Sequence, residues 1–436
     1  MSDWRPLLLL TALSVTFGCE AEVAPPREQW LVTISTDARV PQFGDRLRVE
    51  VLDESGKACN ACQRIFDASD ASTFPLSFGV VPTGGPLRVR ARLLRADTLG
   101  PGGEPPPGTS IDLLVPLDEV SRVHMRLSMA CYGLDASAAT NTACDPDTGA
   151  LVDVSRIDQG APDLEPDTWD SVVPCASDPP TGMACIEGAS FLLGDAAAEP
   201  FGDETYYPAP ETLVRLDPFY LDVHELTVGD YLALRREHPD LPEPVRANSP
   251  ALADSQFCSY RGPDDLSTVD YPLNCVSKST AMAICEAREL RLPTEAEWEF
   301  AAGSGTAETL FPWGSDGDVC AHAIVARAEL QPAKCRATQS GILPAGPAPS
   351  TGADATSGGL FDLGGSLSEW VADDFAEYGA DCWSSPTAEN PICSLPTGQS
   401  SVRGGSWNDV PVEAGVVRRH SATSQASATI GLRCAL

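Results

Sequence analysis

The sequence predicts two folded units of different class: an all-β domain over residues 27–133 and a mixed domain of strands, helices and loops over residues 188–436. Three observations support this division. Short runs of alternating apolar and polar residues, separated by Gly, Pro and Asp, fill the first unit. The second unit begins with short strands, continues with helix-forming segments and ends in glycine-rich loops. The length of 436 residues leaves room for about two or three domains.

Five runs in the first unit are predicted to be strands: QWLVTIST, RLRVEVLD, FPLSFGVV, PLRVRARLL and SRVHMRLSM. Such alternation is typical of a β-sandwich in which each strand has one solvated face, so we expect an immunoglobulin-like or transthyretin-like sandwich. The segment TLGPGGEPPPGTS should be a solvated loop within this domain, because three consecutive prolines cannot join a central strand.

Cys59 and Cys62 form the motif CNAC, which has the spacing of redox and zinc sites. The motif follows the turn sequence DESGK, and no helical pattern follows that would lower a thiol pKa. Structural disulfides are therefore the simpler interpretation. Residues 134–187 are rich in Asp, Pro, Ser and Thr and lack periodicity, which predicts an acidic linker pinned by disulfides.

The N-terminus has the features of an export signal. MSDWRPLLLLTALSVTFGCEAE contains one basic residue, Arg5, then an apolar run too short to span a membrane, then Gly18 and Cys19. Cys19 after glycine resembles a bacterial lipoprotein cleavage site. We therefore expect residues 1–19 to be a signal peptide and Cys19 to carry a lipid anchor, with ordinary signal cleavage as the alternative.

The cysteine content also predicts export. The chain contains 15 cysteines, and if one of them is lipidated, an even number remains that could pair in an oxidising compartment. We expect an exported protein of the cell envelope, either lipid-anchored or free in the periplasm or outside the cell.

The charge excludes two classes of partner. The chain has 62 acidic and 29 basic residues, a formal net charge of −33, which repels phosphate backbones and anionic lipid surfaces. Nucleic acid is therefore not an expected partner, and any membrane attachment should come through the lipid anchor only. The acidity is typical of a soluble surface, with cation binding as the alternative reading.

A set of motifs in the second unit carries a family resemblance. In LPTEAEWEF, Thr294 can cap a helix and Glu297 can close a capping box. The set comprises GASFLLGD, PFYLDVHELTVGDYLAL, NCVSKSTAMAICEARELRLPTEAEWEFAAG, LFPWG, GLFDLGGSLSEW, VRGGSW and GLRCAL. In this order, over nearly all of residues 188–436, these motifs resemble the formylglycine-generating enzyme and sulfatase-modifying factor family. The resemblance implies a compact α+β fold related to C-type lectins, and a disulfide between Cys285 and Cys434.

The family's copper site is not expected here. Family enzymes oxidise a sulfatase cysteine to formylglycine with copper and oxygen, and hold copper with two cysteines that follow the serine of the Gly-Gly-Ser-aromatic element. Counted from Ser406, the equivalent positions are Asp409 and Ala414. Because copper(I) favours thiolates, copper is an unlikely cofactor, and we assign no catalytic residue.

Other metal arrangements remain open. Cys382 and Cys393 lie in an inserted segment where a local disulfide is the simpler assignment. His224 and His420 with a carboxylate could form a mononuclear site. The alternative function is therefore a metal-dependent oxidase of this family with altered chemistry.

One calcium element of the family is better preserved. In DLGGSLSE, two carboxylates flank a glycine-containing turn, which could supply the hard oxygen ligands that calcium prefers. Ser366 and Ser368 replace the family's usual Asn and Trp, and Ala323 replaces an expected Asn of a second calcium site. The resemblance implies a structural calcium ion held by the side chains of Asp362 and Glu369 and the carbonyls of Gly365 and Leu367.

The leading hypothesis is a non-catalytic binding module. Relatives with a C-type-lectin-like fold use the region of the Gly-Gly-Ser-aromatic element for ligand recognition, so this region should bind a peptide, a glycan or an envelope protein, and the β-sandwich should be a spacer. The predicted recognition residues are Ser406, Trp407, Asn408, Asp409, Arg418 and Arg419. The structural alternative is that Trp407 belongs to the core and that the two arginines pair with carboxylates. A third hypothesis is a structural envelope lipoprotein in which the sandwich makes the main contact.

Overall fold

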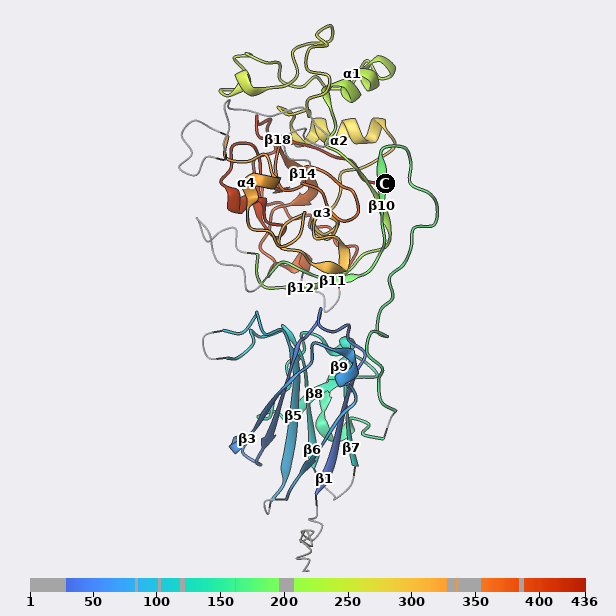
Figure 1. Cartoon of the computed structure of the whole chain (residues 1–436), viewed down its shortest axis with the longest axis vertical. Helices are drawn as coiled ribbons and strands as arrows, with labels where there is room; N and C mark the ends of the chain where they lie inside the picture. The colour runs from blue at the N-terminus through green and yellow to red at the C-terminus, as the bar shows by residue number, and fades with distance from the viewer. Residues whose placement is uncertain are drawn as a thin grey trace, which may run out of the picture.

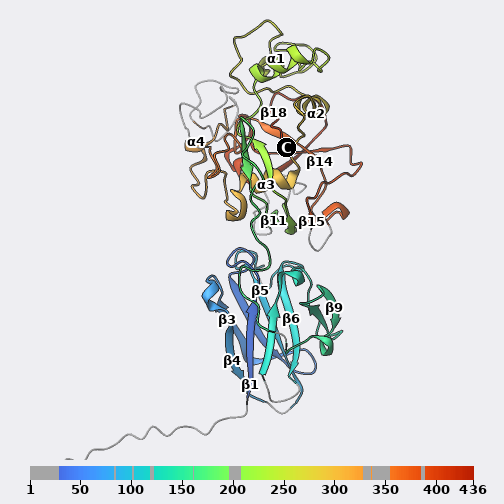
Figure 2. The ribbon, with the colours of Figure 1, turned by 90° about the vertical axis from the view of Figure 1, so that its right-hand side faces the viewer.

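The computed structural model describes residues 29–82, 85–100, 103–117, 122–160, 162–195, 208–327, 335, 354–383 and 388–436, without the side chains of residues 59–61. The predicted signal peptide and Cys19 lie outside the described residues. The N-terminal strands and the C-terminal domain are stacked along the long axis of the molecule (Figures 1 and 2). In the part of the chain that the structure describes, no helix is long and apolar enough to cross a membrane.

The N-terminal part is built from two sheets. One has the order β4-β1-β7 and the other the order β3-β2-β5-β6, and a separate hairpin, β8-β9, follows them. The strand bounds are β1 Trp30–Thr36, β2 Arg46–Leu52, β3 Ala58–Asp67, β4 Leu76–Val80, β5 Leu87–Leu94, β6 Ser110–Leu117, β7 Arg122–Leu127, β8 Thr142–Asp145 and β9 Ala150–Asp153.

Both sheets contribute to one hydrophobic core. In β5, Leu87, Val89, Ala91 and Leu93 are buried at every second position, as the alternating sequence predicts, and they share the core with Ile34 of β1. Each of the five predicted runs contains a strand. The sequence did not reveal β3, whose residues do not alternate, or β6, which is an almost continuous apolar run.

The CNAC motif lies within β3, and Cys62 is disulfide-bonded, whereas the side chain of Cys59 lies outside the described part. The segment expected to be a linker differs from the prediction at its start. Ala143 and Val154 are buried in the N-terminal core, so the hairpin β8-β9 packs with that core. Disulfides do pin the segment, between Cys131 and Cys144 and between Cys175 and Cys185.

The C-terminal domain combines short strands, few helices and long loops. Its sheets have the orders β17-β16-β14-β18, β11-β12-β15 and β10-β13. The element bounds are β10 Met183–Ile186, β11 Ser190–Leu193, β12 Thr212–Arg215, β13 Phe219–Asp222, α1 Val228–Glu237, α2 Lys278–Ala287, α3 Glu295–Ala302, α4 Val319–His322, β14 Ser368–Asp374, β15 Ala388–Glu389, β16 Ser400–Arg403, β17 Arg419–Ala422 and β18 Ile430–Gly431.

Helix α2 is fastened to the C-terminal strand region. Ile284 and Cys285 of α2 are fully buried and share a core with Trp370 of β14 and with Leu432. Cys285 forms a disulfide with Cys434, with the two Cα atoms 5.6 Å apart, as the family resemblance implied. The two cysteines are 149 residues apart in sequence, so the bond joins α2 to the C-terminal end of the domain.

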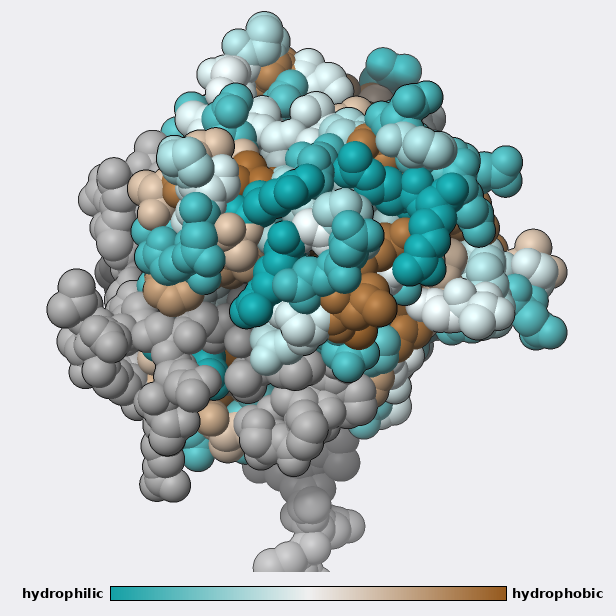
Figure 3. All heavy atoms as spheres, turned by 90° about the horizontal axis from the view of Figure 1, so that it is seen from above, coloured by the Kyte–Doolittle hydropathy of each residue, from teal (hydrophilic) through white to brown (hydrophobic). Residues whose placement is uncertain are grey.

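The two domains meet through both apolar and polar contacts. Leu192 of β11 and Leu213 of β12 are buried in the core of the N-terminal domain. Around them, Gln42 Nε2 donates to Glu308 Oε1 at 2.9 Å, and Arg95 Nη1 lies 3.3 Å from Glu308 Oε2. Away from this contact, the face of the C-terminal domain seen from above is mostly hydrophilic, with small hydrophobic areas between (Figure 3).

Candidate functional site

The segment predicted to form a recognition surface begins in a tight glycine turn after β16. Gly404 has a φ of 76°, and a Cβ atom there would lie 2.7 Å from the carbonyl oxygen of Leu363. A Cβ atom on Gly405 would lie 2.8 Å from the carbonyl oxygen of Gly364. Glycines are required at both positions because two backbone segments touch there. The turn thus places the following residues directly over the segment that contains the predicted calcium ligands.

The first residues after this turn are held from within. Ser406 donates its backbone N–H and its hydroxyl to Asp409 Oδ2, at 2.9 and 2.6 Å. The Trp407 ring lies 4.8 Å from the Phe257 ring, between centroids, and its Nε1 donates to the carbonyl of Ala428 at 3.1 Å. Because the side chains of Ser406 and Trp407 are buried, they cannot contact a ligand at the surface, and this part of the recognition prediction was wrong.

Arg419 is also buried, which corrects its predicted surface role. Strands β16 and β17 are antiparallel and pair Arg403 with Arg419. Arg419 donates from Nε and Nη2 to the two carboxylate oxygens of Glu295 at 2.7 and 2.8 Å, and from Nη1 to the carbonyl of Ala376. Its guanidinium carbon lies 3.9 Å from the centroid of the Tyr378 ring. Arg419 therefore pairs with a carboxylate, as the structural alternative predicted.

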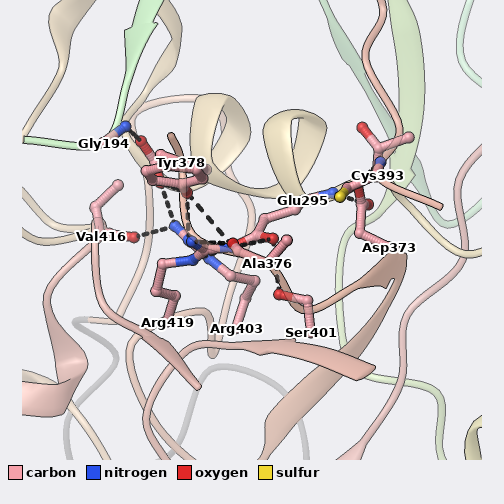
Figure 4. Close-up of polar contacts among 12 residues, drawn as sticks. Gly194, Glu295, Asp373, Ala376, Tyr378, Cys393, Ser401, Arg403, Val416 and Arg419 are labelled. Atoms are coloured by element: carbon pink, nitrogen blue, oxygen red, sulfur yellow. Dashed lines mark hydrogen bonds and ion pairs between the residues drawn. The ribbon is translucent and has the colours of Figure 1, made fainter. Parts of the chain in front are cut away.

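Arg403 completes a buried network of charges (Figure 4). Its Nη1 donates to Glu295 at 3.0 Å, and its Nη2 pairs with Glu299 and donates to the carbonyl of Val416 at 2.8 Å. Two arginines and two glutamates thus balance in charge. Isolated buried charges are strongly unfavourable, and mutual pairing with additional hydrogen bonds offsets that penalty.

Helix α3 positions both glutamates. Thr294 accepts a hydrogen bond from the backbone N–H of Glu297, and Glu297 accepts one from the N–H of Thr294, which confirms the predicted capping box. Once the helix starts there, Glu295 and Glu299 are four residues apart and lie on one face. That face points toward the arginines of β16 and β17 in Figure 4.

The network shifts the acidity of its members in opposite directions. Burial acts to raise the pKa of Glu295, but the neighbouring Arg419 and Arg403 outweigh it and hold the pKa below the usual value. Burial raises the pKa of Glu299, which has one arginine partner, and raises the pKa of Tyr378 well above its usual value. These side chains are buried, so the network braces the fold.

A second buried cluster surrounds Arg433. Its guanidinium pairs with both oxygens of Glu369 at 2.8 Å from Nε, and Trp298 Nε1 donates to the same carboxylate at 2.8 Å. Glu225 accepts hydrogen bonds from the Ser366 hydroxyl at 2.9 Å and from a backbone N–H at 2.8 Å.

The carboxylates of this cluster repel one another. Burial, followed by repulsion from Asp362 and Glu369, raises the pKa of Glu225 well above its usual value. Burial and Asp362 likewise raise the pKa of Asp354, which accepts a hydrogen bond from a backbone N–H at 3.0 Å. Four buried carboxylates therefore share the field of Arg433, and only two of them, Asp362 and Glu369, are predicted from the sequence.

The predicted calcium ligands lie at this cluster, with Asp362 and Glu369 both near Arg433. Both oxygens of Glu369 already accept hydrogen bonds. Gly365 is tightly packed, because a Cβ atom there would lie 2.7 Å from the backbone nitrogen of Ile324. Among the residues that the structure describes, no group of three or more His, Cys, Asp and Glu side chains has an arrangement that could hold a metal ion.

Comparison with known proteins identifies the C-terminal domain. The family described as the sulfatase-modifying factor enzyme 1-like domain matches residues 170–436, which is more than half of the chain. The chain belongs to this family.

Relatives of the chain include a formylglycine-generating enzyme and a protein described as inactive. The formylglycine-generating enzyme of Bos taurus is 30% identical over 31% of this chain and 43% of that protein, so the chain spans less than half of the enzyme's length. The inactive C-alpha-formylglycine-generating enzyme 2 of Mus musculus is 26% identical over 60% of this chain and 86% of that protein. The solved structure of PvdO from Pseudomonas aeruginosa is 19% identical, with a TM-score of 0.43, and covers 61% of this chain and 97% of its own.

The two positions that the family resemblance assigns to copper ligands, Asp409 and Ala414, make other contacts in this structure. Asp409 caps the turn at Ser406, and Ala414 is buried in a small apolar cluster with Phe311 and Ala323. Every cysteine whose side chain the structure describes is disulfide-bonded, including the local pair Cys382–Cys393 and the pairs Cys258–Cys275 and Cys320–Cys335. The described part of the chain thus offers no thiolate for copper(I).

The two histidines of the alternative metal site have other neighbours. His224 stacks on Phe361, with ring centroids 4.9 Å apart, and burial lowers its pKa. His420 Nε2 lies 3.4 Å from Glu413 Oε2. Three of the predicted recognition residues are partly exposed and can still contact a ligand. They are Asn408, Asp409 and Arg418, and they lie close to His420 and Glu413 in sequence.

Proposed function

We propose that this member of the sulfatase-modifying factor family is a non-catalytic binding module that recognises a peptide, a glycan or an envelope protein. The observation that carries the proposal is the use of the copper positions: Asp409 accepts two hydrogen bonds from Ser406, and Ala414 is a buried apolar residue. The disulfide bonds of the described cysteines support it, because a cysteine in a disulfide cannot serve as a thiolate ligand for copper(I). A mouse relative described as inactive is consistent with such a role.

The proposed recognition surface consists of Asn408, Asp409 and Arg418 on the loop between β16 and β17. It rests on the buried Trp407 and on the Arg403–Glu295–Arg419 network, which hold the loop from beneath. A preorganised polar surface favours recognition because little conformational entropy is lost on binding. The buried network therefore contributes to binding by positioning the loop.

The N-terminal domain is, in this proposal, an immunoglobulin-like or transthyretin-like spacer that joins the binding domain to a lipid anchor at Cys19. The disulfides of the described chain support an oxidising location outside the cytoplasm. The anchor is tested by metabolic labelling of expressing bacteria with radioactive palmitate. Label in the wild-type chain and its loss in Cys19→Ala support the anchor, and equal labelling of both chains, or of neither, contradicts it.

We also propose a structural calcium ion at Asp362, Gly365, Leu367 and Glu369. Carboxylate and carbonyl oxygens suit this cation, and a bound cation would relieve the repulsion that Asp362 and Glu369 exert on Glu225. The expected result is a higher melting temperature in calcium than in chelator, with the difference lost in Asp362→Asn. Equal melting temperatures in calcium and in chelator would show that Arg433 alone balances the cluster.

The absence of copper chemistry is tested with copper(I) and a peptide that contains a cysteine. The wild-type chain should bind no stoichiometric copper(I) and should not oxidise the peptide. The double variant Asp409→Cys, Ala414→Cys should gain copper(I) binding, because it restores two soft ligands at the family's positions. Turnover by the wild-type chain would overturn the proposal in favour of a metal-dependent oxidase.

The binding role needs a positive test. The purified chain is applied to arrays of defined glycans and peptides, beside the double variant Asn408→Ala, Arg418→Glu. The matched control is Arg246→Glu, which changes an exposed arginine outside the loop, with 52% side-chain exposure. Ligands kept by the control and lost by the double variant support the surface. Ligands retained by all three chains, or none at all, count against it.

A further inference from the structure

A second surface, separate from the loop that follows β16, has the features of a docking groove. A cavity of about 510 Å³ lies where α2, β13, β14 and the segment before α3 meet. None of residues 401–420 lines it. An inference about this groove therefore does not depend on the proposed function of that loop.

The groove carries a local concentration of exposed apolar side chains. Met282 of α2 is 43% exposed, Ile392 is 50% exposed and Leu436 is 49% exposed, and all three line the cavity together with the buried Leu292. Single exposed apolar residues are common on protein surfaces, but a contiguous group around a hollow marks an interaction site. Met282 is unbranched and flexible, so it can adapt to ligands of different shape.

The polar groups of the groove are mainly acidic. Glu286 is exposed on α2, and Asp217 lies on the same lining, where its carboxylate accepts a hydrogen bond from Asn390 at 2.9 Å. The cation of the lining, Arg291, is already neutralised, since both of its terminal nitrogens donate to Glu297 at 2.6 Å. The excess charge is therefore negative, and a matching ligand carries positive charge beside its apolar groups.

We propose that this groove binds an extended segment of a partner protein in which leucine-like apolar side chains stand beside lysine or arginine. The apolar side chains of the segment cover Met282, Ile392 and Leu436, and its cation meets Glu286. A second copy of this chain is a poor occupant. Each copy carries a formal net charge of −33, so two copies repel one another.

The probe for this test is a fluorescein-labelled heptapeptide of alternating leucine and lysine, titrated with the purified full chain and followed by fluorescence anisotropy. Two control peptides replace leucine with serine, or lysine with glutamate. The wild-type chain should bind the leucine–lysine peptide and neither control peptide. Tight binding of the serine–lysine peptide would show general attraction to an acidic surface, and lack of binding to the leucine–lysine peptide would also overturn the proposal.

Variants locate the binding site. Met282→Ser with Ile392→Ser should weaken binding about tenfold or more, and Glu286→Gln should weaken it less and reduce its dependence on salt. The matched controls are Leu266→Ser, at an apolar side chain that is 59% exposed outside the groove, and Asp270→Asn, at another exposed position. Both controls should bind like the wild-type chain.

Two further measurements separate the remaining outcomes. Thermal denaturation of each variant shows that lost binding does not come from unfolding. Equal affinity of groove variants and controls would overturn the proposal. Sedimentation of the full chain tests the second-copy alternative, since a dimer that Ile392→Ser abolishes would assign the groove to self-association and contradict a basic partner.

Discussion

Arg403 Nη1 lies 3.0 Å from Glu295 Oε1, and neither side chain is exposed to solvent. Arg419 pairs with the same carboxylate, so one glutamate of α3 holds two neighbouring strands. The arginine of the VRGGSW motif and the first glutamate of the EAEWE sequence are therefore structural partners. Motifs that identify the family in sequence serve here to hold the loop between β16 and β17.

Removal of the Glu295 charge should destabilise the fold strongly. Glu295→Gln leaves Arg403 and Arg419 buried with too little negative charge, for which we expect a loss of about 3 to 5 kcal/mol in the free energy of unfolding. Urea denaturation measures it. Arg246→Gln breaks an exposed ion pair with Glu243 and should cost about 1 kcal/mol or less. Similar losses in both variants would contradict a structural role for the network.

Stability should depend on pH through Asp373. Burial, with repulsion from Glu295, raises the pKa of Asp373 to about 7. Between about pH 4 and pH 7 the folded chain keeps a proton that the unfolded chain has lost, so this contribution to stability falls as the pH rises. Asp373→Asn should reduce the fall in the free energy of unfolding across this pH range by at least about 1 kcal/mol. Urea denaturation of the wild-type chain and of Asp373→Asn at several pH values tests this, and equal pH dependence in the two chains would contradict it.

The close backbone contact at Gly404 predicts a large cost for alanine. Gly404 and Gly398 have similar φ angles of 76° and 74°, but an added Cβ atom meets the Leu363 carbonyl only at Gly404, and nothing within 4 Å at Gly398. Gly398→Ala should cost about 1 kcal/mol for the backbone conformation. Gly404→Ala should cost about 3 kcal/mol, because steric overlap is added. Thermal denaturation measures both, and equal losses would show that the loop can shift.

The long-range disulfide should contribute more stability than a short-range one. On the chain-entropy model, loss of the Cys285–Cys434 bond, with a sequence separation of 149, should cost about 5 kcal/mol. Loss of the similarly buried Cys258–Cys275 bond, with a separation of 17, should cost about 3 kcal/mol. Paired Cys→Ala variants are compared by urea denaturation. A larger loss in the short-range pair would contradict the entropic account.

The sequence alone was sufficient to predict those strands and helix starts that depend on interactions between neighbouring residues. The alternation in RLRVEVLD and PLRVRARLL produced strands, and the Thr294–Glu297 capping box fixed the start of α3. Long-range burial was less predictable. Trp407 and Arg419 were expected at the surface, but their partners Phe257 and Glu295 lie more than a hundred residues away, so no neighbouring residue indicated them.

The carboxylates around Arg433 illustrate the same limit. Asp362 and Glu369 belong to one motif and were identified together, whereas Glu225 and Asp354 come from separate segments and join them only in the folded chain. A signal did exist in the sequence, because acidic residues within apolar segments indicate buried pairs. It did not show which arginine would balance them.

The burial of Leu192 and Leu213 in the N-terminal core has a mechanical consequence. A chain whose domains share core residues does not bend freely between them. Leu192 and Leu213 therefore couple the N-terminal domain directly to β11 and β12 of the C-terminal domain, so a force on one domain acts on the other. The contact between the two domains therefore sets the direction in which the binding surfaces of the C-terminal domain face.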